Sequence, residues 1–270
     1  MFRFSNMLFE PIWNNQFIEK VEMKIYEKLD VQGRGAFYDS IGALRDVGQN
    51  HMLRMALIAM ENPHTLEASA VRTERHKVMK SLQPIEGKDV KKFTVRGQYK
   101  GYRNEASVAK TPRPKPISDS KLFINNRCWK GVPFYLESGK AMKESKAEIQ
   151  VYQRIRCTFL PKGWRCDFQN VITFKIQPEE GTSIRFWAKP GLVSTLEPRE
   201  LAFSYNEEKA AKKPWTPMNA YCLTVAKGDQ TFFTSTGRSL CFLKSRATGL
   251  SGPGKEGTAS IRQGEPGSKK

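Results

Sequence analysis

Asp46 and His51 are the side chains of this chain whose types and spacing best suit proton transfer. His51 follows Asp46 by five residues and opens an apolar, helix-like run that continues to Met60. A carboxylate that orients an imidazole makes a general base usable near neutral pH. The same pair also fits an acidic residue at a helix start and a half-buried histidine without a catalytic role. The surrounding motifs have to decide between the two interpretations.

Five motifs follow one another in order along residues 2–236. They are Phe9–Asn14, Gly33–His51, Trp129–Ala141, Ile176–Gly181 and Gly228–Phe233. Together they resemble one family, glucose-6-phosphate dehydrogenase, and within it the C-terminal substrate domain. Any one motif alone would be weak evidence. Five motifs in the family's order favour catalytic roles for Asp46 and His51 over purely structural ones.

The resemblance implies the chemistry of the pair. Members of this family oxidise the C1 hydroxyl of glucose 6-phosphate to a lactone, the first step of the oxidative pentose phosphate pathway, with hydride transfer to NADP. His51 matches the proton acceptor, and Asp46 matches the carboxylate that orients it and contacts substrate. Residues five apart on an ideal helix point about 140° apart. Either Asp46 therefore lies before the regular helix, or a π-type bulge near Gly48 brings the two together.

Three further residues match positions that contact the sugar in this family. They are Glu27, which contacts a sugar hydroxyl, Lys140, which contacts the substrate, and Gln177, which lies near the sugar. An ammonium suits an anionic sugar phosphate, and Gly139 beside Lys140 allows a close approach. Each residue also has an interpretation without a function. Glu27 would be a solvent-facing carboxylate on a strand, Lys140 a solvated surface lysine, and Gln177 an amide at a strand end that is hydrogen-bonded to the backbone.

The sequence departs from the family pattern at a second cationic contact, where Ser145 stands. Lys143 and Lys146 are the neighbouring cations that could compensate. Some animal members also carry a structural NADP site built on basic residues. We do not predict that site here, because the matching positions are Glu137, Gln150 and Lys175.

The dinucleotide-binding signals of the family are not found in this sequence. Neither a Gly-rich phosphate loop after a strand nor the family's His-Tyr-x-x-Lys phosphate grip occurs. A pyrophosphate needs such a cradle at a helix N-terminus. We therefore expect NADP to be bound mainly by an N-terminal domain that this chain lacks, and assign no cofactor-binding residues to the chain.

Composition indicates a globular protein of ordinary size. Hydrophobic residues make up 39 % of 270 positions, which is enough for a full core. No apolar run reaches the roughly 18 residues of a membrane span, and we expect no leader peptide and a cytoplasmic protein. The five cysteines do not have metal-ligand spacing, so we expect reduced thiols and no metal site.

The formal charge of +18 raises the possibility of a nucleic-acid-binding protein. Its distribution argues against one. Residues 91–121 hold nine Lys and Arg against two Asp and Glu, and residues 237–270 hold seven against two. Twelve of the 18 charges thus lie in two segments where the family pattern fails, rather than on one face of a folded element.

The family's sequence pattern is interrupted in those two segments. Residues 109–118 place proline at alternate positions, where the family has a strand start, and residues 237–270 lose the family pattern altogether. A plausible reverse translation, read in a shifted frame, restores family-like sequence in both places. The alternative is a natural Pro-rich linker and a disordered tail. On either account we expect residues 109–118 to be irregular, and residues 237–270 to be extended and unpacked.

Hydrophobic periodicity predicts a mixed fold. Val21–Glu27 alternates like a half-buried strand, and helices are predicted from about Ile41 to Asn62 and over Thr73–Leu82. The further predicted strands are Phe93–Tyr99, Val132–Leu136, Ala147–Val151, Asn170–Gln177 and Ser183–Lys189; Tyr221–Val225 is β-prone, although the family match places it in a helix. We expect an α+β fold with a large, mainly antiparallel sheet and helices packed largely on one face.

The domain organisation leaves two functions open. Residues 1–236 form the family's C-terminal-like domain, and 237–270 a basic tail that is disordered or frameshifted. The chain is then a partial dehydrogenase, inactive alone, that binds glucose 6-phosphate and forms a homo-oligomer in the complete enzyme, with neither nucleic acid nor membrane as partner. The alternative is a non-catalytic sugar-phosphate-binding or dimerisation module of the same fold.

Overall fold

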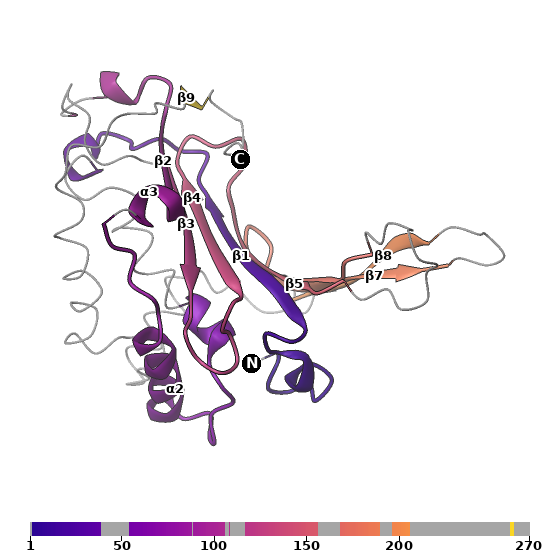
Figure 1. Ribbon diagram of the computed structural model, residues 1–270. Helices are drawn as coiled ribbons and strands as arrows, with labels where there is room; N and C mark the ends of the chain where they lie inside the picture. Colours follow the sequence, from indigo (N-terminus) through magenta and orange to yellow (C-terminus); the bar gives the residue numbers. More distant parts are fainter. Residues whose placement is uncertain are drawn as a thin grey trace, which may run out of the picture.

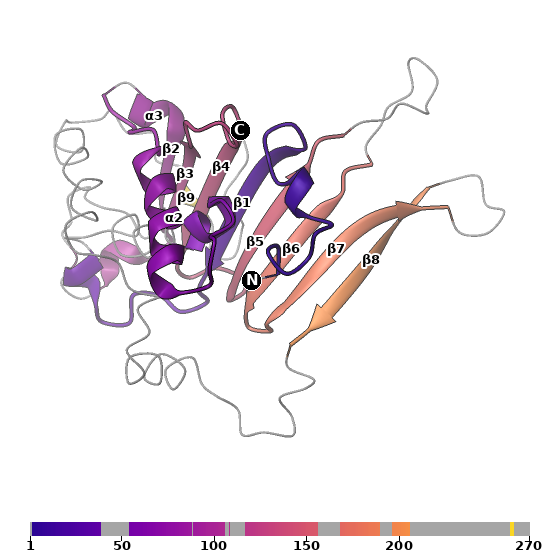
Figure 2. The same cartoon turned by 90° about the horizontal axis from the view of Figure 1, so that it is seen from below.

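A nine-stranded sheet forms the centre of the molecule (Figure 1). The computed structural model describes residues 2–38, 54–87, 89–105, 108, 117–155, 168–189 and 196–205, and the backbone of 260–261. The strand order is β8-β7-β6-β5-β1-β4-β3-β2-β9. Figure 2 shows the strands side by side, with α2 lying across one face of the sheet.

Successive residues of each strand point to opposite faces of the sheet. One face carries the main apolar core, and the other carries charged residues in β1 and a second apolar cluster at one end. The bounds of the strands are β1 Ile18–Tyr26, β2 Thr94–Tyr99, β3 Ile117–Phe123, β4 Pro133–Gly139, β5 Lys146–Gln153, β6 Val171–Gln177, β7 Gly181–Ala188, β8 Glu197–Ser204 and β9 Ser260–Ile261. In β1, Val21, Met23 and Ile25 belong to the main apolar core. Glu22 and Lys24 lie between these residues in the sequence. They point to the opposite face of the sheet, because successive side chains of a strand alternate between the two faces.

The pairing at the middle of the sheet is parallel, as is the short β2–β9 pairing at one edge, whereas the others are antiparallel. β1 and β4 are parallel, with Tyr26 in register with Gly139. β1 pairs antiparallel with β5 on its other side. The carboxyl ends of β1 and β4 therefore meet at the same edge of the sheet.

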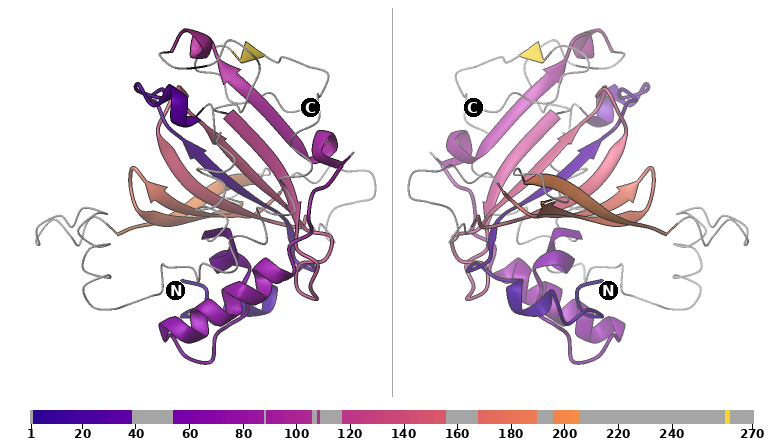
Figure 3. Two further views of the ribbon diagram at one scale, coloured as in Figure 1. Left: turned by 90° about the vertical axis from the view of Figure 1, so that its left-hand side faces the viewer. Right: turned by 90° about the vertical axis from the view of Figure 1, so that its right-hand side faces the viewer.

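α2 packs on one side of the sheet (Figure 3). The described helical elements are α2 Ala68–Lys80 and α3 Asp89–Phe93, the 3-10 turns η1 Glu10–Ile12 and η2 Tyr102–Asn104, and helical residues at 35–38 and 54–59. Val71 and Val78 of α2 enter the same core as β1 and β4. Tyr38 and Tyr102 belong instead to a second apolar cluster, with Tyr26 of β1. None of the helices in the described ranges is long and apolar enough to cross a membrane.

These elements confirm the predicted fold class, an α+β fold with a large, mainly antiparallel sheet. The predicted strands are all present, with ends shifted by up to three residues. The second helix begins at Ala68, five residues before the predicted Thr73. Within the described part, the first helix ends at Ala59 instead of Asn62. Residues 221–225 lie outside the described ranges.

The structure describes two short parts of the doubtful segments. Ile117 and Ser118 open β3, an interior strand paired with both β2 and β4, so the expected irregularity does not include these two residues. Ser260 and Ile261 are extended, as expected, and pair parallel with Gln98 and Tyr99 of β2. At both places the backbone pairs with a neighbouring strand, although the local sequence does not favour a strand. Residues 109–116 and the rest of 237–270 lie outside the described ranges.

Candidate functional site

The parallel pair β1–β4 brings two predicted substrate residues together. Glu27 follows the last residue of β1, and Lys140 follows the last residue of β4. Because Tyr26 is in register with Gly139, the next residues of both strands are neighbours. The Lys140 ammonium donates to Glu27 Oε2 and forms an ion pair with it. Two residues chosen as candidate sugar contacts therefore lie in direct contact with each other.

The two charges are unequally exposed. The Lys140 side chain is 4 % exposed, whereas that of Glu27 is 42 % exposed. The carboxylate thus lies between the ammonium and solvent. A molecule approaching from solvent meets the acceptor oxygens of Glu27 before the donor of Lys140. Carboxylate oxygens of this kind accept hydrogen bonds from sugar hydroxyls.

Backbone hydrogen bonds hold the ends of the two strands in place. The Glu27 amide donates to the Gly139 carbonyl (2.9 Å), and the Met142 amide donates to the Glu27 carbonyl (3.0 Å). Ala141 has a φ of 55° in the turn between them. A Cβ on Gly139 would lie 2.8 Å from Met142 Sδ, so the Met142 side chain packs directly over this glycine. The turn fixes where the Lys140 side chain leaves the backbone.

An aromatic cluster lies next to the ion pair. The Lys140 Nζ lies 5.1 Å from the centroid of the Tyr38 ring. Tyr38 is 1 % exposed. The second apolar cluster of the protein surrounds it and consists of Tyr26, Val31, Tyr38, Tyr99, Tyr102, Ile117, Ala141 and Met142. Sequence analysis missed Tyr38, because an aromatic residue in a glycine-bearing turn gives no local signal of a role.

Gln177 lies at the same end of the sheet, two strands from Glu27. It is the last residue of β6 and is exposed, and it pairs with Ala147 of β5, which pairs in turn with Ile25 of β1. A one-residue bulge leaves Ile176 unpaired and brings Gln177 into register with Ala147. The Gln177–Pro178 peptide is cis. Among the described residues, no hydrogen bond joins Gln177 to Glu27 or Lys140.

Ser145 stands where the family has a second cationic substrate contact, and here it makes a hydrogen bond to the backbone. Ser145 Oγ accepts a 2.9 Å hydrogen bond from the Lys28 amide and so holds the residue after Glu27. Lys146 forms ion pairs with Glu144 (2.8 Å) and Glu148 (3.4 Å). It pairs in register with Tyr26, so it lies on the sheet face opposite Ile25. Lys146 is therefore engaged by two carboxylates, with its Nζ 5.4 Å from the centroid of the Tyr26 ring, whereas Lys143 is exposed.

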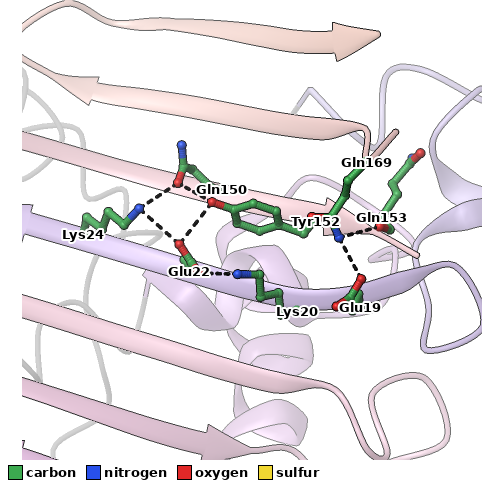
Figure 4. Close-up of polar contacts among 8 residues, drawn as sticks. All are labelled: Glu19, Lys20, Glu22, Lys24, Gln150, Tyr152, Gln153 and Gln169. Carbon is green, nitrogen blue, oxygen red and sulfur yellow. Dashed lines mark hydrogen bonds and ion pairs between the residues drawn. The ribbon is translucent and has the colours of Figure 1, made fainter. Parts of the chain in front are cut away.

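The sheet face opposite the main core holds a second polar cluster, centred on Glu22 (Figure 4). Its carboxylate accepts hydrogen bonds or ion pairs from Lys20 (2.6 Å), Lys24 (3.1 Å) and Tyr152 Oη (3.1 Å). Burial would raise the pKa of Glu22, but the two lysines outweigh it and hold the pKa below its ordinary value. Gln150 accepts from Lys24 (3.0 Å) in the same cluster. The cluster satisfies its own charges, which fits a structural role.

Asp46 and His51, the predicted catalytic pair, lie outside the described residues. The described ranges contain no group of three or more His, Cys, Asp and Glu side chains placed to bind a metal ion.

Comparison with known proteins decides the family. The family profile described as "Glucose-6-phosphate dehydrogenase, C-terminal domain" matches residues 1–239. This chain belongs to the glucose-6-phosphate dehydrogenase family. The glucose-6-phosphate 1-dehydrogenase of Borreliella burgdorferi is 37 % identical over 217 residues, covering 76 % of this chain and 45 % of the relative. A cytoplasmic form from Arabidopsis thaliana is 36 % identical over 236 residues, covering 86 % and 44 %.

Solved structures of glucose-6-phosphate dehydrogenase have the same fold. The enzyme from Mycobacterium avium matches with a TM-score of 0.83 and 26 % identity, over 97 % of this chain and 55 % of that chain. A glucose-6-phosphate dehydrogenase in complex with its substrate glucose 6-phosphate matches with a TM-score of 0.85 and 28 % identity, over 98 % and 57 %. The chain thus spans about half the length of the relatives it matches, and corresponds to their C-terminal domain. The family is one of dehydrogenases that use a nicotinamide cofactor.

Proposed function

We propose that this chain supplies the substrate half of an NADP-dependent glucose-6-phosphate dehydrogenase and is inactive alone. The observation that carries the proposal is the Glu27–Lys140 pair at the ends of β1 and β4. The two residues lie 113 positions apart in the sequence and form an ion pair, which supports a shared site. The solved relative with bound glucose 6-phosphate supports the same substrate for this domain.

The proposed roles follow from the chemistry. Glu27 accepts a hydrogen bond from a sugar hydroxyl, with Lys140 behind it, and Gln177 borders the sugar. His51 removes the C1 hydroxyl proton, and Asp46 orients the imidazole and stabilises its charge. When bound, NADP accepts the hydride. The chain's sequence has no phosphate loop, so the residues present do not fit NADP, and its binding falls to another domain.

The substrate, oligomeric state and cellular location of the complete enzyme are proposed from its family membership. The partner molecule is glucose 6-phosphate, and the complete enzyme is a homo-oligomer in the cytoplasm. Relatives named as cytoplasmic support the location, although chloroplast forms occur as well. The second candidate function, a sugar-phosphate-binding module without catalysis, is favoured by the fact that the chain carries sugar-site residues without a cofactor cradle.

Fusion to a cognate dinucleotide-binding domain tests the proposal. With residues 109–118 restored to the family pattern, the fusion should reduce NADP with glucose 6-phosphate, and the isolated chain should not. His51→Ala should lower the rate about a hundred- to ten-thousandfold, because a general base is lost. His64→Ala is the matched control, since His64 is exposed and outside the motifs. Turnover by the isolated chain would contradict the proposal; a fusion that binds sugar without turnover would favour the module.

A further inference from the structure

Tyr38 is a buried residue beside the sugar site that has no role in the proposed reaction. The helical turn 35–38 places it, and its amide donates to the Arg34 carbonyl (3.0 Å). Gln32 and Gly33, with φ of 45° and 73°, reverse the chain just before this turn. The backbone therefore directs an aromatic ring to the place where Lys140 ends.

The Lys140 ammonium has two described neighbours of complementary character. Glu27 binds it as an ion pair, and the Tyr38 ring lies 5.1 Å away at its centroid. An aromatic face attracts a cation through its quadrupole, and this attraction is stronger when water is excluded. Lys140 is almost fully buried here. Ring and carboxylate together determine where the ammonium lies.

The exposures assign different tasks to the two charged groups. Glu27 faces solvent, while Lys140 lies behind it and has its charge compensated. A phosphate group would have to displace Glu27 to reach this ammonium. A sugar hydroxyl needs only the free lone pairs of the carboxylate. The geometry therefore favours recognition of a polyol over recognition of an anion at this spot.

We propose that Tyr38 is a positioning residue of the sugar site, which holds Lys140 against Glu27 so that the carboxylate presents fixed acceptors to sugar hydroxyls. Lys140 then acts through Glu27 and does not contact the phosphate. This inference rests on the proposed function for its ligand. It identifies the specificity of this part of the site as one for the hydroxylated ring of the substrate.

Substitutions at two positions test the inference. Tyr38→Leu removes the ring, Tyr38→Phe keeps it as the matched control, and Lys140→Met removes the charge. In protein labelled at lysine, NMR should show the Lys140 methylene protons shifted by the Tyr38 ring current, with the assignment made by their loss in Lys140→Met. The shift should persist in Tyr38→Phe and disappear in Tyr38→Leu. This readout requires no sugar.

Sugar affinity supplies the second readout. Binding of glucose 6-phosphate is measured by calorimetry, and that of glucose by ligand-observed NMR. Tyr38→Leu should weaken both about three- to thirtyfold, the range expected for a cation–π contact, and Tyr38→Phe, which keeps the ring, should weaken both less. Lys140→Met should weaken both sugars by a similar factor. A loss confined to glucose 6-phosphate in Lys140→Met would show a direct phosphate contact and overturn the inference.

The remaining outcomes separate this inference from the proposed function. Unchanged Lys140 resonances in Tyr38→Leu, or the same loss of shift in Tyr38→Phe, would overturn the inference whatever the sugar data show. If the unmodified chain binds neither sugar, the proposed function of the isolated domain fails. The ring-current shift alone then decides whether Tyr38 positions Lys140.

Discussion

Trp129 Nε1 donates a 2.7 Å hydrogen bond to the carbonyl of Ala59, a residue 70 positions earlier in the chain. Ala59 ends the helical residues 54–59, and the last carbonyls of a helix have no partner inside it. The neighbouring carbonyls are bound in the same way. Ile58 accepts from Trp13 Nε1 (2.8 Å), and Met60 accepts from Arg3 (2.6 Å). Buried side chains from two distant segments thus complete this helix end.

Trp129→Phe should destabilise the protein by about 1–3 kcal/mol, because it leaves the buried Ala59 carbonyl without its donor. Urea unfolding followed by circular dichroism measures the change. Trp187→Phe is the matched control, since Trp187 Nε1 donates a 3.1 Å hydrogen bond at a partly exposed position. Equal losses in the two variants would mean that the helix end needs no buried donor.

Glu22→Ala should cost about 3 kcal/mol of folding free energy. It removes a nearly buried carboxylate and leaves the Lys20 and Lys24 ammonium groups, which are largely buried, without their partner. Glu197→Ala breaks an ion pair with Arg199 whose side chains are about half exposed, and it should cost at most about 1 kcal/mol. Chemical denaturation of both variants compares the two. Similar values would show that the Glu22 cluster contributes no more than a surface pair.

The sequence predicted those strands in which one face is apolar. β1 and β4 alternate clearly, and both were found. β3 was missed because its inward positions include Ser118 and Ser120, which are buried but polar. β8 was missed because it is exposed along almost all of its length and contains Pro198. A strand that lies at the edge of the described part of the sheet, or that buries serine, leaves little periodicity to detect.

The candidate residues could be selected by their match to the family, but their spatial arrangement depends on the sheet topology and could not be predicted. Lys140 lies in a motif and Glu27 matches a family position, but no local pattern shows that β1 and β4 run parallel and meet at one edge. Tyr38 and Ser145 were missed as contributors because their roles depend on partners far along the chain. Ser145 attracted notice only as a departure from a cationic position, whereas its hydroxyl holds the Lys28 amide.

Asp119 should make the protein less stable as the pH rises. Burial, followed by the nearby charge of Glu137, raises the pKa of Asp119 from 3.8 to about 6 in the folded protein. The folded state then binds a proton more tightly than the unfolded state. The stability supplied by this proton is fully present below about pH 4 and is lost as pH rises through about 6.

Asp119→Asn should remove this contribution. The stability of Asp119→Asn minus that of the original protein should grow between pH 4 and 7 and level off above. Urea midpoints measured at intervals of pH from 4 to 8 give this difference. Lys121→Gln, on the same strand, serves as the control for a general change in charge. A difference that does not vary with pH would rule out Asp119 as the titrating group.

Ser145→Ala should loosen the chain directly after Glu27. The Ser145 hydroxyl is the acceptor for the exposed Lys28 amide, at 2.9 Å. Its loss should speed hydrogen exchange at the Lys28 amide about tenfold, and should lower glucose 6-phosphate affinity a few-fold because the adjacent carboxylate is held less firmly; a neutral hydrogen bond is worth about 1 kcal/mol. Ser145→Thr keeps the hydroxyl and should behave like the original protein. Unchanged exchange at Lys28 in Ser145→Ala would show that the strand ends are fixed by the backbone bonds to Gly139 and Met142 alone.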